Sequence, residues 1–348
     1  MRFTTFSLDR PDDASHWDAF VQSCHQGSPF HLTAWIRTIV EGYGLRARLF
    51  GLLDEGNSIR AVVPFVPRHA PLSRPRLVCL PFTDYCGPLG IEESDSVRLL
   101  EAVRRHAGRR LARIEVRGSL PKAAGFSEVC YYRRHILPLK RDPNEIQVDK
   151  RTVVYNIRRA RKAGVEIIED NTWNGCSEFY KLSILTRKKH GIPSQPESLY
   201  RSLAGNMVDR GLASVLLAVH ESRVVAGAIL LKFGDTVYYK YNASDPAVLH
   251  RFSPNHLLAW TAIERACVQG YQFFDFGRSA SDNEGLMRYK RMWGAEEIAL
   301  PYAFSPQSLG KVMRSEHSRT FEALKVLWRL LPDPIIRMIG LKVLRYFG

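Results

Sequence analysis

One order of helices and strands occurs twice along the chain, and this recurrence constrains the fold more than any single motif. In the first half a helical pattern from Asp13 to about Tyr43 precedes two apolar runs within residues 47–68. The runs flank the turn residues of an expected β-hairpin. A third strand at residues 76–82, a helix near Asp95 to Ala107 and a strand at residues 112–118 complete the first series.

The second series repeats the element order without repeating residue identities. Its expected elements are a strand at residues 164–170, helices at 173–191 and near 199–210, three strands within 213–245, a helix at 253–270 and a strand at 273–277. Two domains of one mixed plan follow from this repetition. We therefore expect an α+β protein with two domains, each a twisted mixed, largely antiparallel sheet flanked by helices.

The polar segment RDPNEIQVD lies between the two series and marks the expected boundary between the domains. We place the first domain at residues 1–145, the second at residues 146–304, and a basic amphipathic helical tail at residues 305–348. The tail alternates apolar residues with Lys and Arg around Pro332 and Pro334. Residues 320–348 would lie in an anionic membrane interface or pack on the first domain, and both interpretations stay open.

Charge and cysteine usage restrict the partners and the compartment. The chain carries 50 Lys and Arg against 35 Asp and Glu, a formal charge of +15, which favours anionic partners. Its 6 cysteines include no C-x-x-C pair, so neither a zinc knuckle nor a disulfide scaffold is expected, and we expect no metal. The N-terminus has no apolar signal region and no run is long enough to span a bilayer. We expect a cytoplasmic protein, at most peripheral at the inner membrane face.

A basic helix opens the second domain with DKRTVVYNIRRARKAGV. Six cations lie within thirteen residues that contain no acid, while Val153, Ile157 and Ala160 recur at helical spacing on one face. Such a face is either merely solvated or binds an anion, and the missing acids exclude pairing within the helix. Arginine donates two parallel hydrogen bonds to phosphate. We therefore name Arg158, Arg159 and Arg161 as candidate substrate-binding residues.

The sequence NASDPAVLHRFSPNHLLAW contains a well-formed helix start. Ser253 is an expected N-cap, with Pro254 at the first helical position, and the N–H groups at such an end can bind an anion. Tyr239 and Tyr241 leave the preceding strand nearby. We name Asn255 and these two tyrosines as candidate substrate-binding residues, against the alternative of an ordinary helix start.

The stretch FFDFGRSASDNEGLMRYKRMWGAEE carries the densest chemistry. Asp275 alternates with phenylalanines, so a carboxylate lies near the interior of the sheet and needs a cationic partner, for which Arg278 or Lys290 is expected. A purely structural ion pair is the alternative. Asp275, Arg278 and Lys290 are the expected catalytic residues. Ser279 and Trp293 are further candidates for binding substrate.

These blocks, with SPFHLTAW and LPFTDYCGPLG in the first half, resemble the FemAB peptidyltransferases of the GNAT acyltransferase superfamily. The resemblance covers most of residues 25–305. Within the family, the chain most resembles the members associated with exopolysaccharide and exosortase gene clusters. The resemblance implies paired GNAT-like domains with a site in the cleft between them. On the LPFTDYCGPLG block it adds Asp84 and Tyr85 as substrate-binding residues.

The resemblance implies transfer of an acyl or aminoacyl group to an amine of a cell-envelope or exopolysaccharide precursor. Direct attack is expected, because no Ser-His-Asp spacing supports a covalent intermediate. The donor is acyl-CoA or aminoacyl-tRNA, and no cofactor is expected to bind permanently. The CoA-cradling R/Q-x-x-G-x-G/A loop and a long charged hairpin near tRNA are both missing, so the donor stays open.

Expected partners are an anionic or lipid-linked acceptor, tRNA and an anionic membrane surface. The alternative function is a non-catalytic module that binds phosphate or RNA.

Overall fold

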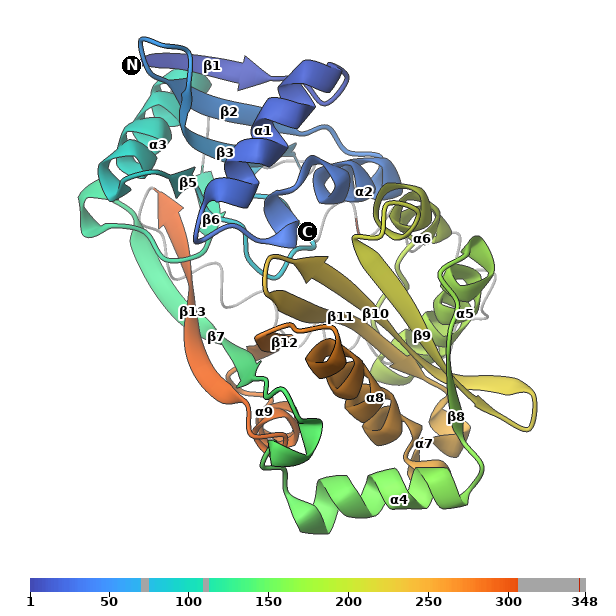
Figure 1. Cartoon of the computed structure of the whole chain (residues 1–348). Helices are drawn as coiled ribbons and strands as arrows, with labels where there is room; N and C mark the ends of the chain where they lie inside the picture. The colour runs from blue at the N-terminus through green and yellow to red at the C-terminus, as the bar shows by residue number, and fades with distance from the viewer. Residues whose placement is uncertain (70–74, 109–112, 306–343, 345–348) are drawn as a thin grey trace. The chain divides into compact units, whose positions relative to one another are not determined.

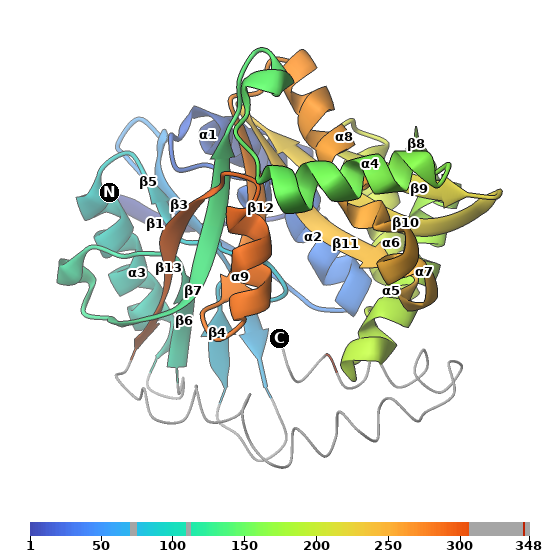
Figure 2. The ribbon, with the colours of Figure 1, turned by 90° about the horizontal axis from the view of Figure 1, so that it is seen from below.

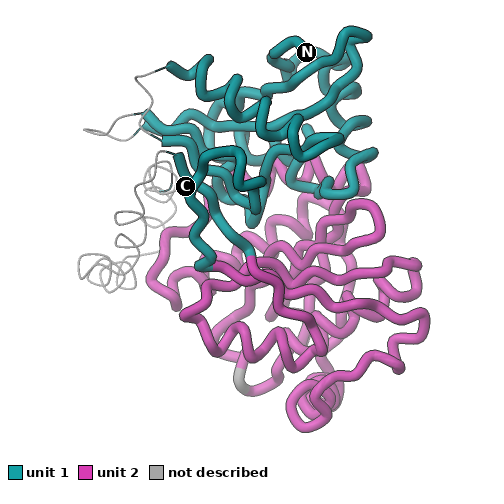
Figure 3. Tube along the Cα trace, turned by 90° about the vertical axis from the view of Figure 1, so that its left-hand side faces the viewer, with its two compact units in different colours: residues 1–131, 300–318, 344–348 teal, residues 132–299, 319–343 magenta. Residues whose placement is uncertain are grey.

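The computed structural model describes residues 1–69, 75–108, 113–305 and 344, and these form two compact units. The first unit contains residues 1–131, 300–305 and 344 of the described chain, and the second contains residues 132–299 (Figure 3). Two strands, β7 (Ser127–Pro138) and β13 (Glu296–Ser305), each begin in one unit and end in the other. Within residues 1–305, the described chain therefore passes between the units at β7 and again at β13.

The first unit is a mixed sheet with helices packed on it (Figure 1). Its sheet has the order β1-β2-β3-β4-β6-β13, and β5 pairs with β3. The β4–β6 pair is parallel, whereas β1–β2, β2–β3, β3–β4 and β6–β13 are antiparallel. Its other elements are β1 (Arg2–Phe6), α1 (Pro11–Ser23), η1 (Pro29–His31), α2 (Thr33–Tyr43), β2 (Arg48–Leu53), β3 (Ile59–Arg68), β4 (Arg76–Val78), β5 (Leu89–Gly90), α3 (Glu93–Ala107), β6 (Arg113–Arg117) and η2 (Lys122–Ala124).

Local sequence explains where these elements begin and end. The expected hairpin is confirmed as β2 and β3, whose turn places Asn57 in the left-handed region with φ 63°. The expected helical pattern from Asp13 to Tyr43 is divided into α1 and α2, because Pro29 starts a separate 3-10 turn. Gly44, with φ 62°, then ends α2 as a left-handed cap.

The second unit is a sheet of order β7-β12-β11-β10-β9-β8. The β11–β12 pair is parallel, whereas β7–β12, β10–β11, β9–β10 and β8–β9 are antiparallel. Its other elements are η3 (Pro143–Glu145), the π-helical turn η4 (Lys150–Val154), α4 (Tyr155–Lys162), β8 (Glu166–Glu169), α5 (Trp173–His190), α6 (Glu197–Leu203), the π-helical turn η5 (Ala204–Val208), β9 (Ala213–His220), β10 (Arg223–Phe233), β11 (Thr236–Ser244), α7 (Pro246–Phe252), α8 (Pro254–Val268), β12 (Phe273–Ala280) and α9 (Glu284–Arg291).

Helices cover both faces of the central strands of the second unit. Figure 2 shows α8 on one side of β9, β10 and β11 and α5 on the other, and both helices contact these strands. The α8 face turned to the sheet is apolar, with Leu258, Ala262 and Ile263 buried. Two covered faces explain why β10 reads as a nearly continuous apolar run instead of alternating.

The parallel strands β11 and β12 pair over a short distance only. Thr236–Tyr238 of β11 lie opposite Phe273–Asp275 of β12, and within the described chain the two strands do not pair further. Yet β11 continues to Ser244 and β12 to Ala280. Beyond Tyr238 and Asp275 the two strands therefore separate, and the residues that come after these two border the space between the strands.

The α+β class and the mixed, largely antiparallel sheets flanked by helices are confirmed. The sequence did not predict β1, β7, β13, α7 or α9. The domain boundaries expected at residues 145 and 304 stay a prediction. The expected amphipathic tail lies outside the described residues except for Ser305, the last residue of β13, and Leu344, which are both buried.

Candidate active site

A cavity of about 600 Å³ lies where β11 and β12 diverge in the second unit. Its walls come from the strands β11 and β12, the helices α4, α7 and α9, and the start of α8. The lining residues are Asn156, Arg159, Tyr239, Lys240, Asn242, Leu249, Ser253, Asn255, His256, Phe276, Arg278, Leu286, Tyr289 and Lys290. Four of these described lining residues are Lys or Arg and none is Asp or Glu. The cavity therefore favours a ligand with negative charge.

A β-bulge in β11 decides which tyrosine reaches the cavity. Ile229 and Leu230 of β10 lie opposite Tyr241 and Tyr239, so Lys240 is the extra residue of the bulge. Tyr239 and Lys240 both line the cavity, whereas the Tyr241 ring lies 6.4 Å from the Tyr200 ring, outside it. Regular alternation would have placed both tyrosines on one face. Of the two candidate tyrosines, Tyr239 therefore lies at the cavity and Tyr241 does not.

Asp275 is buried, as the sequence predicted, but its cationic partner is a different residue from those expected. Its Oδ2 lies 2.6 Å from Nε of Arg134, which is 141 residues away on β7. Its Oδ1 accepts a hydrogen bond of 2.8 Å from the backbone N–H of Gly277. The expected pairing with Arg278 or Lys290 is thus corrected, because the antiparallel β7–β12 ladder brings Arg134 beside Asp275. Asp275 does not line the cavity.

The backbone at Gly277 forms a second bulge, in β12. Phe276 and Gly277 together lie opposite the single residue His135 of β7, and Gly277 takes φ 70°, which only glycine adopts without strain. Lys290 reaches this bulge from α9. Its Nζ donates to the carbonyl oxygens of Gly277 at 2.8 Å and Arg278 at 3.2 Å. Lys290 is 4% exposed as a residue, and the two hydrogen bonds fix its ammonium at the cavity wall.

Arg278 stands beside Lys290 with its guanidinium 4.3 Å from the centre of the Tyr132 ring. This stacking holds the side chain at the cavity wall while it stays partly exposed. Of the three expected catalytic residues, the structure brings Arg278 and Lys290 to the cavity and leaves Asp275 behind it.

The start of α8 contributes polar groups to the cavity, although not through the expected side-chain cap. Ser253 has a left-handed backbone with φ 54°, and its hydroxyl donates to Oδ1 of Asn156 at 2.9 Å instead of capping α8. Asn255 lines the cavity. Its Oδ1 is buried and has no hydrogen-bond partner among the described residues. Asn255 therefore carries an acceptor that a ligand can satisfy.

Aromatic rings form one wall. The imidazole of His256 stacks on Trp293 at 6.1 Å and meets Tyr289 edge-on at 5.4 Å. Trp293 is fully buried behind this wall and contacts Phe276 at 6.0 Å between ring centres. Burial lowers the pKa of His256 to about 4 and raises the pKa of the Tyr289 and Tyr239 phenols. Near neutral pH the wall is therefore uncharged.

The basic helix packs as the sequence predicted, with Val153, Ile157 and Ala160 buried and the arginines exposed. The three candidate arginines do not lie together at the cavity. Arg159 lines it, whereas Arg161 forms an ion pair of 3.8 Å with Glu264 of α8. Arg158 is exposed and lies outside the lining set.

Three other candidates lie outside the cavity. Asp84 and Tyr85 belong to the first unit, where Tyr302 donates to the Asp84 carbonyl at 2.8 Å and Tyr85 contacts Phe30. Ser279 is buried, and its Oγ has no hydrogen-bond partner among the described residues.

Sequence reasoning missed Lys240 and His256. A lone lysine in a strand and a lone histidine in a helix carry no sequence signal that separates them from ordinary surface or core residues. The bulge at Lys240 and the contact of His256 with α9 depend on pairing between distant segments.

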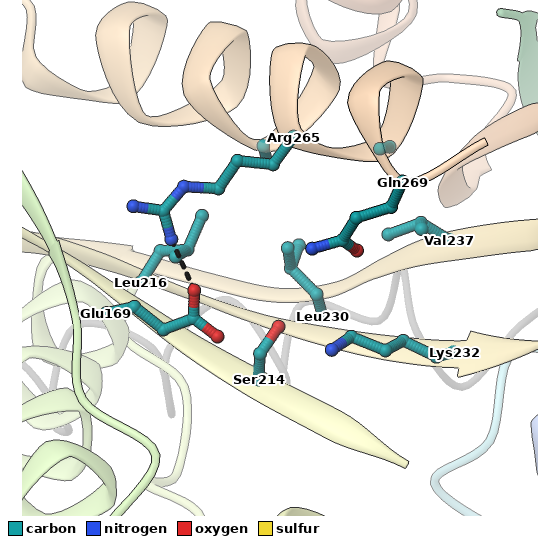
Figure 4. A pocket seen from close by; sticks show the side chains of 10 residues that line it. Glu169, Ser214, Leu216, Leu230, Lys232, Val237, Arg265 and Gln269 are labelled. Atoms are coloured by element: carbon teal, nitrogen blue, oxygen red, sulfur yellow. Dashed lines mark hydrogen bonds and ion pairs between the residues drawn. The ribbon is translucent and has the colours of Figure 1, made fainter. Parts of the chain in front are cut away.

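A second cavity in the same unit, shown in Figure 4, holds only about 20 Å³ and lies between α8 and the sheet. Arg265 and Gln269 of α8 face Glu169, Ser214 and Lys232 there, and Arg265 forms an ion pair with Glu169. A space of this size holds about one water molecule. It is therefore a polar contact between helix and sheet and is too small for a substrate.

The described residues contain neither a candidate metal-binding cluster nor a helix suited to span a membrane. Within residues 1–69, 75–108, 113–305 and 344, no group of three or more His, Cys, Asp or Glu is placed to hold a metal ion. No helix in that part of the chain is long and apolar enough to cross a bilayer.

Comparison with known proteins identifies the type of the second unit. Residues 149–291 match the family model described as an acetyltransferase (GNAT) domain. A curated relative is the UDP-N-acetylmuramoylpentapeptide-lysine N(6)-alanyltransferase of Weissella viridescens, 23% identical over 139 residues, or 39% of this chain. The match spans only 40% of the length of that relative.

Solved structures share the fold at low identity. The crystal structure of FemX superimposes with a TM-score of 0.68 at 17% identity, covering 87% of this chain and 97% of FemX. A tandem GNAT protein from the clavulanic acid biosynthesis pathway gives a TM-score of 0.51 at 12% identity, covering 87% of this chain and 97% of that chain. The architecture is therefore GNAT-like with tandem GNAT and FemX-like neighbours. Residues 149–291 match a GNAT acetyltransferase domain, and this match supports an enzyme that transfers acyl groups.

Proposed function

We propose that this protein transfers an acyl or aminoacyl group to an amine of a cell-envelope precursor, by direct attack in the cavity between β11 and β12. The observation that carries the proposal is the cavity itself. In a GNAT domain, two diverging parallel strands and two helices present four cations and no carboxylate to one space. An activated acyl donor with phosphate groups fits that charge.

Lys290 and Arg278 suit the developing oxyanion or a phosphate of the donor. Attack by an amine puts negative charge on the carbonyl oxygen, and donors fixed beforehand stabilise this charge most. Lys290 is fixed by two backbone carbonyls and Arg278 by the Tyr132 ring. Asp275 supports them indirectly, because it binds the Gly277 backbone at the same bulge. We therefore assign Asp275 a positioning role instead of contact with the amine.

Direct attack is favoured over a covalent intermediate. Among the described lining residues Ser253 is the one serine, and its hydroxyl donates to Asn156 and is not bonded to His256. No cysteine is among the described lining residues. No activated serine or thiol is thus present there to take the acyl group first.

The acceptor and donor are the finer parts of the proposal. The Weissella viridescens relative is named for alanyl transfer to a lysine amine of a UDP-linked muramyl pentapeptide. This favours a peptidoglycan precursor, free or lipid-linked, over an exopolysaccharide precursor. Aminoacyl-tRNA and acyl-CoA both remain donors to test, and Arg158, Arg159 and Arg161 would bind phosphates of either. Placement at the inner membrane face would follow from a lipid-linked acceptor.

Mass spectrometry of the acceptor tests the proposal. The purified protein is incubated with UDP-N-acetylmuramoyl pentapeptide containing lysine and with alanyl-tRNA or acetyl-CoA. We expect the acceptor to gain the mass of one acyl group with one of the two donors. Binding of the acceptor or of tRNA without any product from either donor would contradict the proposal and favour the non-catalytic binding module.

A further inference from the structure

The imidazole of His256 takes no part in the transfer chemistry proposed above. His256 lies on α8 and lines the same cavity as the cations at which the donor would bind. Its Nε2 is buried and lacks a hydrogen-bond partner among the described residues. Buried polar atoms without partners are uncommon and require an explanation, and a ligand is one such explanation.

Direct attack needs a group that takes a proton from the amine. Carboxylates are excluded, because the described lining residues include no Asp or Glu and Asp275 is bound to Arg134 and Gly277. The remaining ionisable lining groups are cations or phenols that burial keeps protonated. They are Arg159 on α4, Tyr239 and Lys240 on β11, Arg278 on β12, and Tyr289 and Lys290 on α9. His256 is left as the lining side chain with a free basic nitrogen.

We propose that the His256 imidazole is the proton acceptor for the amine during transfer, an inference that rests on the proposed function. The amine nitrogen bonds to the carbonyl carbon of the donor R′C(=O)–X, and one N–H proton passes to the imidazole. As the C=O bond re-forms, the C–X bond breaks and the imidazolium returns the proton to the leaving group. The products are R′C(=O)–NHR and HX, where X is the terminal ribose oxygen of tRNA or the sulfur of CoA.

The surroundings of His256 suit this task. Trp293 and Tyr289 fix the ring from two directions, so its orientation is set before substrate binds. Burial holds the pKa of His256 near 4, so the ring is neutral near pH 7. The ammonium of a tetrahedral intermediate is far more acidic than a free amine. A weak base can therefore accept its proton and release it readily to the leaving group.

Replacement of His256 tests the proposal in the transfer assay with alanyl-tRNA or acetyl-CoA. Because general-base catalysis typically contributes about 10²–10⁴-fold, H256Q should lower kcat by about 10²-fold and change KM little. H220Q is the matched control, since His220 stacks on Phe252 and lies outside the cavity lining. Its kcat should equal that of the wild type. An H256Q kcat within about twofold of the wild type would overturn the inference.

Chemical rescue separates proton transfer from a structural role. H256A should regain activity when imidazoles are added, and the regained rate should rise with the basicity of the added imidazole. A rescue that follows only the size of the added molecule, or no rescue of a folded H256A protein, would overturn proton transfer. Circular dichroism of each variant verifies its fold.

Nuclear magnetic resonance provides a readout that does not need turnover. The ring carbons of His256 are assigned by comparing the wild type with H256Q, and Nα-acetyl-lysine N-methylamide is added as the amine probe. We expect the His256 signals to shift with probe concentration while those of His220 stay constant. Unchanged His256 signals at the highest concentration would overturn the inference. If wild-type protein shows no transfer with either donor but these shifts occur, the proposed function fails and the amine site stands.

Discussion

Asp275 and Lys290 both bind the backbone of the bulge at Gly277, and this shared target connects a buried ion pair to the cavity wall. Asp275 accepts from the Gly277 N–H and pairs with Arg134, whereas Lys290 donates to the Gly277 and Arg278 carbonyls. The sequence predicted that these residues act together. It could not predict the partner Arg134, because strand pairing between segments 141 residues apart has no local signature.

The Asp275–Arg134 pair should matter more for stability than any exposed carboxylate. Asp275 is 1% exposed, and removing its charge leaves Arg134 without its partner. D275N should lower the free energy of unfolding by about 3 kcal/mol or more in urea denaturation. The matched control D209N, at an exposed position, should change it by less than about 0.5 kcal/mol. Equal small effects in both variants would show that the ion pair contributes little.

Arg278 should contribute to transfer and little to the fold. Its guanidinium is partly exposed and lines the cavity, so R278A should reduce kcat/KM at least about tenfold while the melting temperature stays within a few degrees of wild type. R288A is the control, because Arg288 on α9 is exposed and lies outside the lining set. Retention of full activity by R278A would remove Arg278 from the site.

At the scale of elements, the sequence predicted most helices and central strands because their apolar spacing is regular. The hairpin β2–β3, the basic helix α4 and the helix α8 all follow from such patterns. The bulges at Lys240 and Gly277 break the alternation of β11 and β12, and they were not predicted. Both bulges lie at the cavity, so local sequence rules fail at the site itself.

The basic helix α4 should bind phosphate chiefly through Arg159, the arginine that lines the cavity. R159Q should weaken tRNA binding and flatten its dependence on salt, because fewer counterions are released. R158Q should have a smaller effect, and R161Q should also break the ion pair with Glu264. Fluorescence anisotropy with labelled tRNA at two salt concentrations measures this. The control R210Q, exposed at the end of η5, should match wild type, and wild-type affinity that ignores salt would contradict a phosphate role.

At the scale of the whole molecule, buried neutral histidines should make stability depend on pH. Burial, with further lowering by Lys290, holds the pKa of His135 at about 4, below the value of about 6.5 for an unfolded chain. Between these values the unfolded state binds more protons. The stabilising contribution is therefore complete above about pH 6.5 and is lost as pH falls toward about 4.

Thermal melts at pH 7 and pH 5.5 measure this dependence. The wild-type melting temperature should fall between the two, and H135Q should fall less because the titrating group is gone. H25Q, at an exposed position in the first unit, should behave as wild type. An H135Q decline equal to that of wild type would assign the pH effect to other groups.

The repeated element order predicted the α+β class and the two sheets, because each series of helices and strands encodes its own hydrophobic pattern. It did not predict β7 and β13, the strands that each begin in one unit and end in the other. Their residues are partly polar and belong to neither series, so nothing local marks them as members of a sheet.

The central claim is that transfer takes place in the cavity between β11 and β12. The most direct test compares wild type with K290M in two measurements, single-turnover transfer and donor binding. Acceptor product is quantified by mass spectrometry with the protein in excess over the acceptor and with alanyl-tRNA or acetyl-CoA present as donor. Lys290 is fixed at the cavity wall by two carbonyls, so K290M should still bind donor but lose transfer by at least about tenfold. Since Lys290 is buried, a lower melting temperature is also expected, and the assay is run below it. A folded K290M protein that forms product at the wild-type rate would contradict the account.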